Sequence, residues 1–455
     1  MQWNPLYITL LFLCTFITYV GGRIIVRLGN AGADVSNEAL QEIKKKQQLC
    51  LILCVILNLS ILVFLKYFDF ALGYLNRIFS LFHIPEVSWN YSILLPVGIS
   101  FYTLQALGYL IDVYRGEIEA EKNFLRYALF VSFFPQLVAG PIERSKNLLV
   151  QLREPHSLKY ENIRKGALLV LYGLFLKMVI ADRAAIIVNT VYGDSVKYPG
   201  FYIIVATIFF SIQIYCDFYG YSTIARGSAL LMGIRLMDNF NAPYYAKSVK
   251  EFWRRWHISL SGWFRDYLYI PLGGNRKGKI RKEGNLLVVF AVSGLWHGAS
   301  LAFVVWGLLN GIYQVMADIV MKVKTAACFS KRLFQTVATF ILVTFAWLFF
   351  RAGSLKVSVE LIKNVFSTNN WTILFDGSLY KLGVARNYMN VLILSILSLF
   401  TVDYHKYKGK DAATIFFQQG WWFRTLIIML LIFTILVYGC YGEMYDTKQF
   451  IYFQF

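Results

Sequence analysis

The chain has 455 residues, of which 57% are hydrophobic and 16% are charged. Soluble domains carry roughly 25% charged residues, so this balance excludes an ordinary soluble protein. The 38 Phe, 30 Tyr and 11 Trp also exclude disorder, which requires few aromatic residues and a high charge density. The net charge of +19 would suggest nucleic acid in a soluble protein. In a membrane protein it reflects cytoplasmic loops, so we expect a polytopic membrane protein with no nucleic acid partner.

A helix that crosses the hydrocarbon layer needs about 20 apolar residues, because the layer is roughly 30 Å thick. Nine segments meet this requirement: 6–26, 48–68, 93–112, 167–188, 201–219, 299–320, 333–350, 388–402 and 424–441. Two further runs are interrupted or short, namely 124–140, which contains Pro135, and 285–298. The pattern predicts an all-α integral membrane protein with about 11 transmembrane or partly inserted helices. With no soluble segment between them, we expect one domain over 1–455.

Basic residues orient these segments, because Lys and Arg in short loops stay on the cytoplasmic side. Four stretches of the chain are basic: Lys44 to Lys46, the region 247–282, Lys322 with Lys324, Lys331 and Arg332, and Lys406 with Lys408, Lys410 and Arg424. All four lie inside if the N-terminus is outside, the Pro135 segment is re-entrant and 285–298 crosses once. The first apolar run lacks the basic stretch and cleavage site of a removable signal peptide, so we expect it to be retained.

Region 238–282 differs from its surroundings because aromatic and basic residues alternate along it. This composition predicts an amphipathic cytoplasmic element at the membrane interface. It offers cations for phosphate groups, an indole that could stack on a base and a second proton carrier. These candidates are Arg254, Arg255, Arg265, Trp256 and His257. The alternative is a surface helix whose cations bind lipid phosphates while its Trp residues lie at the headgroups.

His297 ends the apolar run 285–298, next to Trp296 and between glycines. Helix from Asn285 to His297 is about 18 Å long, less than the hydrocarbon thickness, so we expect His297 inside the membrane. An ionisable side chain at that depth is a functional candidate, and a neutral imidazole is suited to accept a proton from an attacking hydroxyl. The alternative is a structural histidine that donates to a carbonyl at a helix break.

Asp217, in the segment Tyr215–Ser222, is another intramembrane charge, and Arg226 follows it. The two side chains are candidates to pair with each other, and either one is a candidate to contact His297 or substrate. Buried charges need partners whether or not they act in catalysis, which favours structural pairing. The six cysteines are scattered, so we predict neither a disulfide framework nor a metal site.

Several longer motifs carry a resemblance to a known family: Leu95–Thr103, Pro135–Arg144, Tyr215–Ser222, Asn239–Tyr244, Trp253–Tyr267, Leu295–Gly298 and Phe450–Phe455. With these motifs the chain resembles the membrane-bound O-acyltransferases, and among them the branch of the alginate O-acetyltransferase membrane subunit. The resemblance implies a rosette of tilted helices with a tunnel that joins a cytoplasmic donor entrance to the opposite face. It implies that His297 is catalytic and that His257, along the donor route, is a second catalytic residue needed for activity. We include Trp296, Asp217 and Asn241 among the expected substrate contacts.

The residues and the resemblance together predict a multi-pass enzyme of the cell membrane. It is expected to move an acyl group, taken to be acetyl, from a cytoplasmic thioester to a hydroxyl of an extracytoplasmic polysaccharide or partner protein. His297 would act as general base or as transient acyl carrier. The expected donor is acetyl-coenzyme A or an acyl carrier protein, with no bound cofactor. The resemblance also implies an esterase-like extracytoplasmic partner of the SGNH type.

Three other functions stay open at this point. The first is transfer of D-alanine from a carrier protein to teichoic acid, in a neighbouring branch of the same family. The second is a transporter that moves a sugar or lipid without chemistry, which predicts transport that survives the loss of His297. The third is a scaffold for cell-wall assembly, which would tolerate changes at both His257 and His297.

Overall fold

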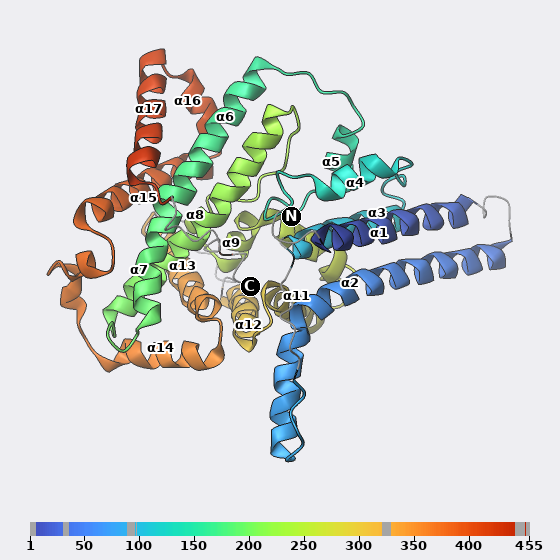
Figure 1. Cartoon of the computed structure of the whole chain (residues 1–455), viewed down its shortest axis with the longest axis horizontal. Coiled ribbons are helices and arrows are strands. Elements are labelled where there is room, and N and C mark those ends of the chain that lie inside the picture. Colours follow the sequence, from blue (N-terminus) through green and yellow to red (C-terminus); the bar gives the residue numbers. More distant parts are fainter. Residues whose placement is uncertain are drawn as a thin grey trace. The chain divides into compact units, whose positions relative to one another are not determined.

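The computed structural model describes residues 6–30, 36–88, 96, 98–320, 329–441 and 451. Every regular element within these ranges is helical (Figure 1), which confirms the all-α prediction. Three features named above fall wholly or partly outside the described residues. These are the start of the Leu95–Thr103 motif, the cations Lys322 and Lys324, and the Phe450–Phe455 motif apart from Ile451.

Six helices are long and apolar enough to cross a membrane. They are α1 (Leu6–Asn30), α2 (Asn37–Leu81), α8 (Phe201–Leu231), α13 (Phe329–Ala352), α15 (Arg386–Tyr407) and α17 (Trp421–Tyr438). Five of them cover a predicted span and α17 overlaps most of the span 424–441, which confirms the membrane location. The predicted number of about 11 inserted helices is not confirmed, because only six meet both criteria in the part of the chain described.

The other predicted segments form shorter or interrupted helices. Segment 167–188 lies in a continuous helical run made of α6 (Tyr160–Leu174), the π-helix η1 (Phe175–Ala181) and α7 (Asp182–Gly193). The remaining apolar segments correspond to α3 (Ile99–Tyr114), α11 (Lys279–His297) and α12 (Leu301–Val320). Helix α4 (Phe124–Ser132) ends before Pro135, and turns follow it. This broken helix is what Pro135 predicts, because proline cannot donate a backbone hydrogen bond.

The chain divides into two compact units, which we describe separately. Unit 1 comprises Met1–Ser157 and Met232–Met237, and unit 2 comprises Leu158–Leu231 and Asp238–Phe455. In unit 1, α1, α2 and α3 pack on one another. The amide of Gln136 donates to that of Gln105 over 2.9 Å, which satisfies polar groups in an apolar interior. The prediction of a single domain stays a prediction.

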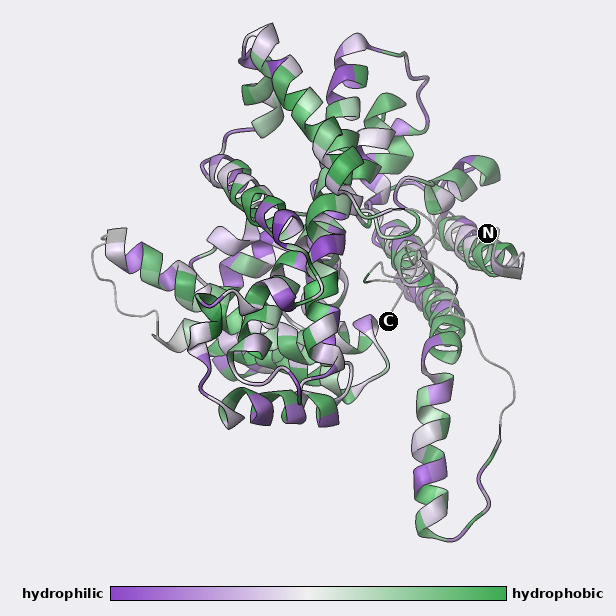
Figure 2. Cartoon of the chain, turned by 60° about the vertical axis from the view of Figure 1, so that its left-hand side comes forward, coloured by the Kyte–Doolittle hydropathy of each residue, from purple (hydrophilic) through white to green (hydrophobic). Residues whose placement is uncertain are grey.

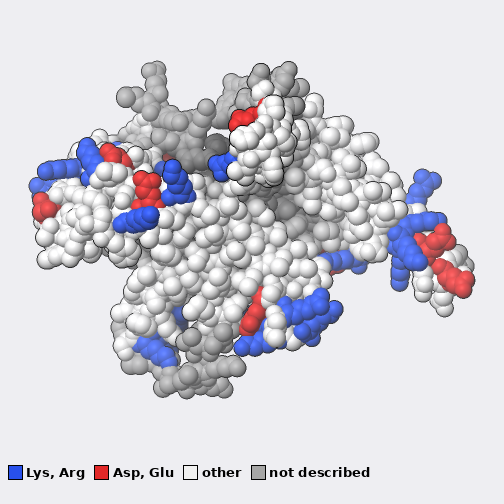
Figure 3. Space-filling model, turned by 90° about the horizontal axis from the view of Figure 1, so that it is seen from below, with Lys and Arg blue, Asp and Glu red and all other residues white. Residues whose placement is uncertain are grey.

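Unit 2 is organised around α8. In its most apolar stretch 72% of the residues are buried, against only 6% for α17. Large exposed side chains such as Leu426 and Met429 therefore cover α17, and in a bilayer these contact lipid. Figure 2 shows hydrophobic residues along the helices, and the face in Figure 3 carries its charges in separate patches on a largely uncharged surface.

Helix α6 packs closely along α8 because glycines meet where the two helices touch. A Cβ atom added to Gly173 would lie 2.7 Å from the carbonyl oxygen of Gly220, and one added to Gly166 would lie 2.8 Å from that of Gly227. Small residues at such positions let two helix backbones approach each other in a membrane protein. This close packing brings the π-helix η1 against the middle of α8.

Candidate functional site

His297 is the last residue of α11, as its position in the apolar run predicts. Helix α12 packs back on α11 through glycines, since a Cβ on Gly294 or Gly307 would overlap a backbone carbonyl of the other helix. The two helices form a tight hairpin whose bend holds the imidazole. The geometry of His297 therefore depends on helix packing and not on a flexible loop.

Aromatic rings surround the His297 side chain, which is only 6% exposed. The ring centroids of Trp296, Trp306 and Phe350 lie 4.8, 5.0 and 5.3 Å from that of the imidazole. We call these four side chains the His297 cluster. Its apolar walls limit the access of water to the imidazole.

His257 joins α9 (Val249–Arg255) to α10 (Ile258–Phe264). Its φ of 45° puts it in the left-handed region, which costs a residue other than glycine roughly 1–2 kcal/mol. Two backbone hydrogen bonds fix this bend: Ile258 donates to the Asn239 carbonyl over 3.0 Å, and Asn241 donates to the Arg255 carbonyl over 2.9 Å. A strained and buried backbone at a histidine is typical of a functional position.

The structure brings both predicted histidines to the same tryptophan. The His257 ring lies 4.5 Å from Phe218 and 6.3 Å from Trp296, measured between centroids. Trp296 also contacts His297. The candidate site therefore extends from the His297 cluster through Trp296 to His257. Region 238–282 is accordingly a series of short helical segments whose His257 and Trp256 are buried, not a single surface helix.

Burial lowers the pKa of His257 from its usual 6.5 to about 3. The residue lies outside the six candidate spans. Because its pKa is lowered, the imidazole is neutral at neutral pH. A neutral ring accepts a proton on one nitrogen and donates from the other.

This pKa predicts how stability depends on pH. Below about pH 6.5 the unfolded chain binds a proton on His257 that the folded protein does not, so this residue destabilises the fold as the pH falls. We expect wild-type protein in detergent to lose more thermal stability than His257→Asn between about pH 8 and about pH 5. Asparagine is chosen because it also tolerates a positive φ. Parallel pH curves for the two proteins would contradict the low pKa.

The three arginines predicted to bind phosphate differ in their exposure and in the groups that they contact. Arg254 is exposed, and so is Arg265, which pairs with the neighbouring Asp266 over 2.7 Å. Arg255 instead donates to Glu251 over 3.0 Å and to the Asn241 carbonyl over 3.1 Å. Only Arg254 and Arg265 of the three therefore present their charge at the surface.

Two predicted substrate contacts have different surroundings. Trp256 is 3% exposed, and its ring packs at 5.3 Å from Phe252 and 5.1 Å from Trp347. Its faces are thus occupied by protein rings. The side-chain oxygen of Asn241 is buried and accepts no hydrogen bond from the described residues, which leaves an acceptor for a ligand or water.

Asp217 does not pair with Arg226. Its carboxylate binds the Lys177 ammonium over 2.5 Å and accepts from the Ile451 backbone N–H over 2.8 Å. Lys177 also binds Asp182, over 2.7 Å, and Arg226 binds Asp238. Lys177 was not among the sequence candidates, although a lysine inside the predicted span 167–188 is itself a signal of a buried ion pair.

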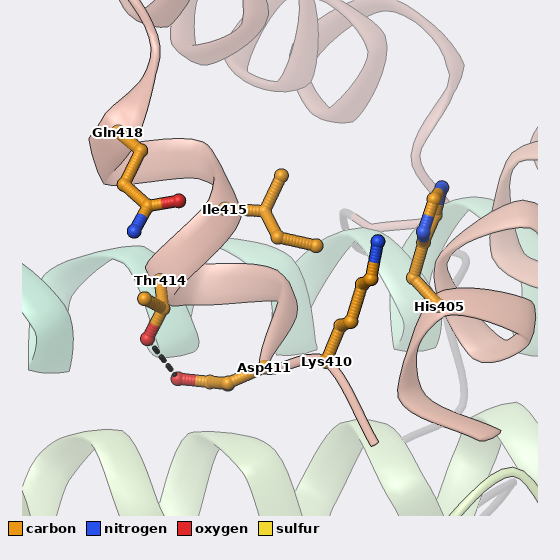
Figure 4. A pocket seen from close by; sticks show the side chains of 6 residues that line it. All are labelled: His405, Lys410, Asp411, Thr414, Ile415 and Gln418. Carbon is orange, nitrogen blue, oxygen red and sulfur yellow. Dashed lines mark hydrogen bonds between the residues drawn. The ribbon is translucent and has the colours of Figure 1, made fainter. Parts of the chain in front are cut away.

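A surface pocket of about 460 Å³ lies at the turn between α15 and α16 (Ala412–Gln418), apart from these residues. Figure 4 shows the six side chains that line it: His405, Lys410, Asp411, Thr414, Ile415 and Gln418. Asp411 is already engaged by Thr414 and by Lys165. None of the predicted site residues lines this pocket, so we place the candidate site at the His297 cluster.

Comparison with known proteins gives consistent matches. The model of MBOAT, the membrane-bound O-acyltransferase family, matches residues 118–358. The probable alginate O-acetylase AlgI of Pseudomonas aeruginosa is 36% identical over 407 residues, covering 86% of this chain and 76% of the relative. The peptidoglycan O-acetyltransferase of Helicobacter pylori is 37% identical over 71% of this chain and 66% of its own. The teichoic acid D-alanyltransferase of Bacillus subtilis is 28% identical, over 48% of this chain and 57% of its own.

Proposed function

Because the chain belongs to the membrane-bound O-acyltransferase family, we propose that it transfers an acetyl group across the membrane, from a cytoplasmic thioester to a hydroxyl of an extracytoplasmic polysaccharide. The observation that carries this proposal is a buried histidine at the end of α11, enclosed by aromatic rings and linked through Trp296 to a second buried histidine. The acetyl group and the polysaccharide are those of the alginate and peptidoglycan O-acetyltransferase relatives.

In the proposed reaction His297 acts as general base. Its unprotonated ring nitrogen takes the proton of the acceptor hydroxyl as that oxygen bonds to the thioester carbonyl carbon. The carbon–sulfur bond then breaks, and the thiolate leaves and takes up the proton. Alternatively, the ring nitrogen attacks the carbonyl carbon and expels the thiolate, so that the imidazole carries the acetyl group. The acceptor hydroxyl oxygen then displaces the imidazole from the acetyl carbon, and the hydroxyl proton goes to the thiolate. In both routes the carrier thiol stays on the cytoplasmic side.

The donor in this proposal is acetyl-coenzyme A. The exposed guanidinium group of Arg254 supports it, because arginine binds phosphate through two parallel hydrogen bonds. Arg265 is also exposed but already donates two hydrogen bonds to Asp266. The acetyl acceptor on the far side is either the polysaccharide or a serine of an esterase-like SGNH-type protein that completes the transfer. His257 is assigned to proton transfer on the donor side of Trp296.

The test uses purified full-length protein in proteoliposomes with acetyl-labelled acetyl-coenzyme A. We expect label to appear on an added acceptor polysaccharide, or as free acetate, in wild type. Parallel reactions receive a D-alanyl carrier protein as donor. Transfer from that donor alone would replace the proposal with D-alanyl transfer. Absence of thioester cleavage with either donor, together with movement of a sugar or lipid across the vesicle, would replace it with transport.

A further inference from the structure

Asn239 lies at the Nδ1 edge of the His257 ring and is 1% exposed. Its side-chain oxygen faces three groups: the Ser259 backbone N–H at 3.2 Å, the Ser259 hydroxyl at 2.9 Å and His257 Nδ1 at 3.2 Å. Its amide nitrogen donates to the Ser222 hydroxyl on α8 over 3.3 Å. The Asn239 side chain thus contacts α8, the start of α10 and the His257 ring.

These contacts fix which end of the amide is the oxygen. A backbone N–H can only donate, so the asparagine atom that faces Ser259 N must be the acceptor. The opposite orientation would place an NH₂ group against that N–H and lose the hydrogen bond from the Ser259 backbone. The direction of the amide therefore follows from chemistry and not from a choice between similar atoms.

The amide direction in turn fixes the tautomer of His257. Nδ1 faces the Asn239 oxygen, which only accepts, and the Ser259 hydroxyl at 3.5 Å, whose hydrogen goes to that same oxygen over 2.9 Å. Nδ1 therefore carries the proton. A neutral imidazole has one N–H, which leaves the lone pair on Nε2. We propose that Asn239 is a positioning residue that holds His257 as the Nδ1-protonated tautomer, with Nε2 as the atom that accepts a proton. The tautomer stands on geometry alone, whereas its use in acetyl transfer rests on the proposed function.

The surroundings support a neutral ring with a fixed orientation. Phe218 packs against it with an interplanar angle of 81°, and the left-handed backbone sets the direction of the side chain. The charged group next to Phe218 on α8 is Asp217, which is engaged by Lys177. The titratable group that shares Trp296 with His257 is His297. The low pKa of the buried ring agrees with the neutral form.

A purely structural role for Asn239 makes different predictions. In that case its contacts with Ser222 and Ser259 would anchor the segment before α9, and the tautomer of His257 would not depend on them. The experiment therefore measures the tautomer directly, in addition to activity.

The chain has five histidines, which makes ¹⁵N-histidine spectra tractable. Full-length protein is labelled and reconstituted in lipid, and the His257 signals are assigned by their loss in His257→Asn. We expect a protonated Nδ1 and an unprotonated Nε2 in wild type and in Asn239→Asp, which keeps the acceptor oxygen. Asn239→Leu is expected to populate the Nε2-protonated form.

Activity provides the second readout. Asn239→Leu is expected to lower kcat for acetyl transfer about tenfold, the effect of losing one hydrogen bond. Asn239→Asp is expected to retain more activity and to move the acidic limb of the pH profile upward, because a carboxylate stabilises the imidazolium. Asn58→Leu, which removes a buried asparagine in unit 1, is the matched control for the loss of a buried amide.

The outcomes separate the inference from the proposed function. A wild-type His257 with its proton on Nε2 would overturn the inference, whatever the activity. So would an unchanged tautomer and an unchanged pH profile in Asn239→Leu that is folded. If the protein has the expected tautomer but cleaves no thioester, Asn239 still orients His257. The proposed acetyl transfer would then be wrong.

Discussion

Replacing His297 with alanine is expected to reduce acetyl transfer by a factor of about 100 to 10,000, the usual contribution of a general acid–base residue. The loss should fall on kcat, since the ring acts on the reacting hydroxyl. His297→Gln fills more of the space between Trp306 and Phe350 and is expected to lose a similar factor. Initial rates with labelled acetyl-coenzyme A in proteoliposomes provide the measurement.

The control for this prediction is His405→Ala, which removes a histidine of the separate α15–α16 pocket. We expect it to keep the wild-type rate. Thermal unfolding of each variant in detergent shows whether the fold persists. A folded His297→Gln protein with the wild-type rate would rule out both the base and the acyl-carrier roles of this residue.

That a helix ends at His297 was predictable because hydropathy marks the apolar run locally, and α11 ends at this residue. The depth of His297 in the membrane stays a prediction. The aromatic enclosure was not predictable, because Trp306 and Phe350 come from α12 and α13 and meet the ring only through helix packing.

The contacts of His257 with residues distant in the sequence could not be predicted either. Its residue type and aromatic neighbours in the chain indicated a functional segment, whereas its contact with Asn239 depends on a backbone bend. The number of spans was also less predictable than their location. Helix α11 begins with charged residues and α3 is short, so a sliding count of apolar residues cannot decide how deeply either one inserts.

The partner of Asp217 was mispredicted for a related reason. Sequence proximity favoured Arg226, on the same helix, over Lys177, which comes from a different helical run. The close glycine packing between α6 and α8 brings Lys177 to the carboxylate. Such approaches between helix backbones depend on how both helices pack, which hydropathy does not report.

Replacing Lys177 with methionine is expected to lower the free energy of unfolding by about 3–5 kcal/mol, the typical effect of removing one partner from a buried ion pair. Lys177 is the cation for both Asp182 and Asp217, and both carboxylates are buried. The measurement is thermal or denaturant unfolding of the full chain in detergent.

Two further variants test whether the loss of stability in Lys177→Met comes from uncompensated buried charge. Lys165→Met removes an ion pair with Asp411 that is 42% and 54% exposed, so its expected cost is at most about 1 kcal/mol. The double variant Lys177→Met with Asp217→Asn is expected to be more stable than Lys177→Met alone, because it removes one of the stranded carboxylates. Equal stability of the single and double variants would mean that Asp217 does not depend on Lys177. Because asparagine keeps an oxygen that can accept from the Ile451 backbone N–H, a recovery of stability would indicate that the stranded charge of Asp217, and not a lost hydrogen bond, destabilises Lys177→Met.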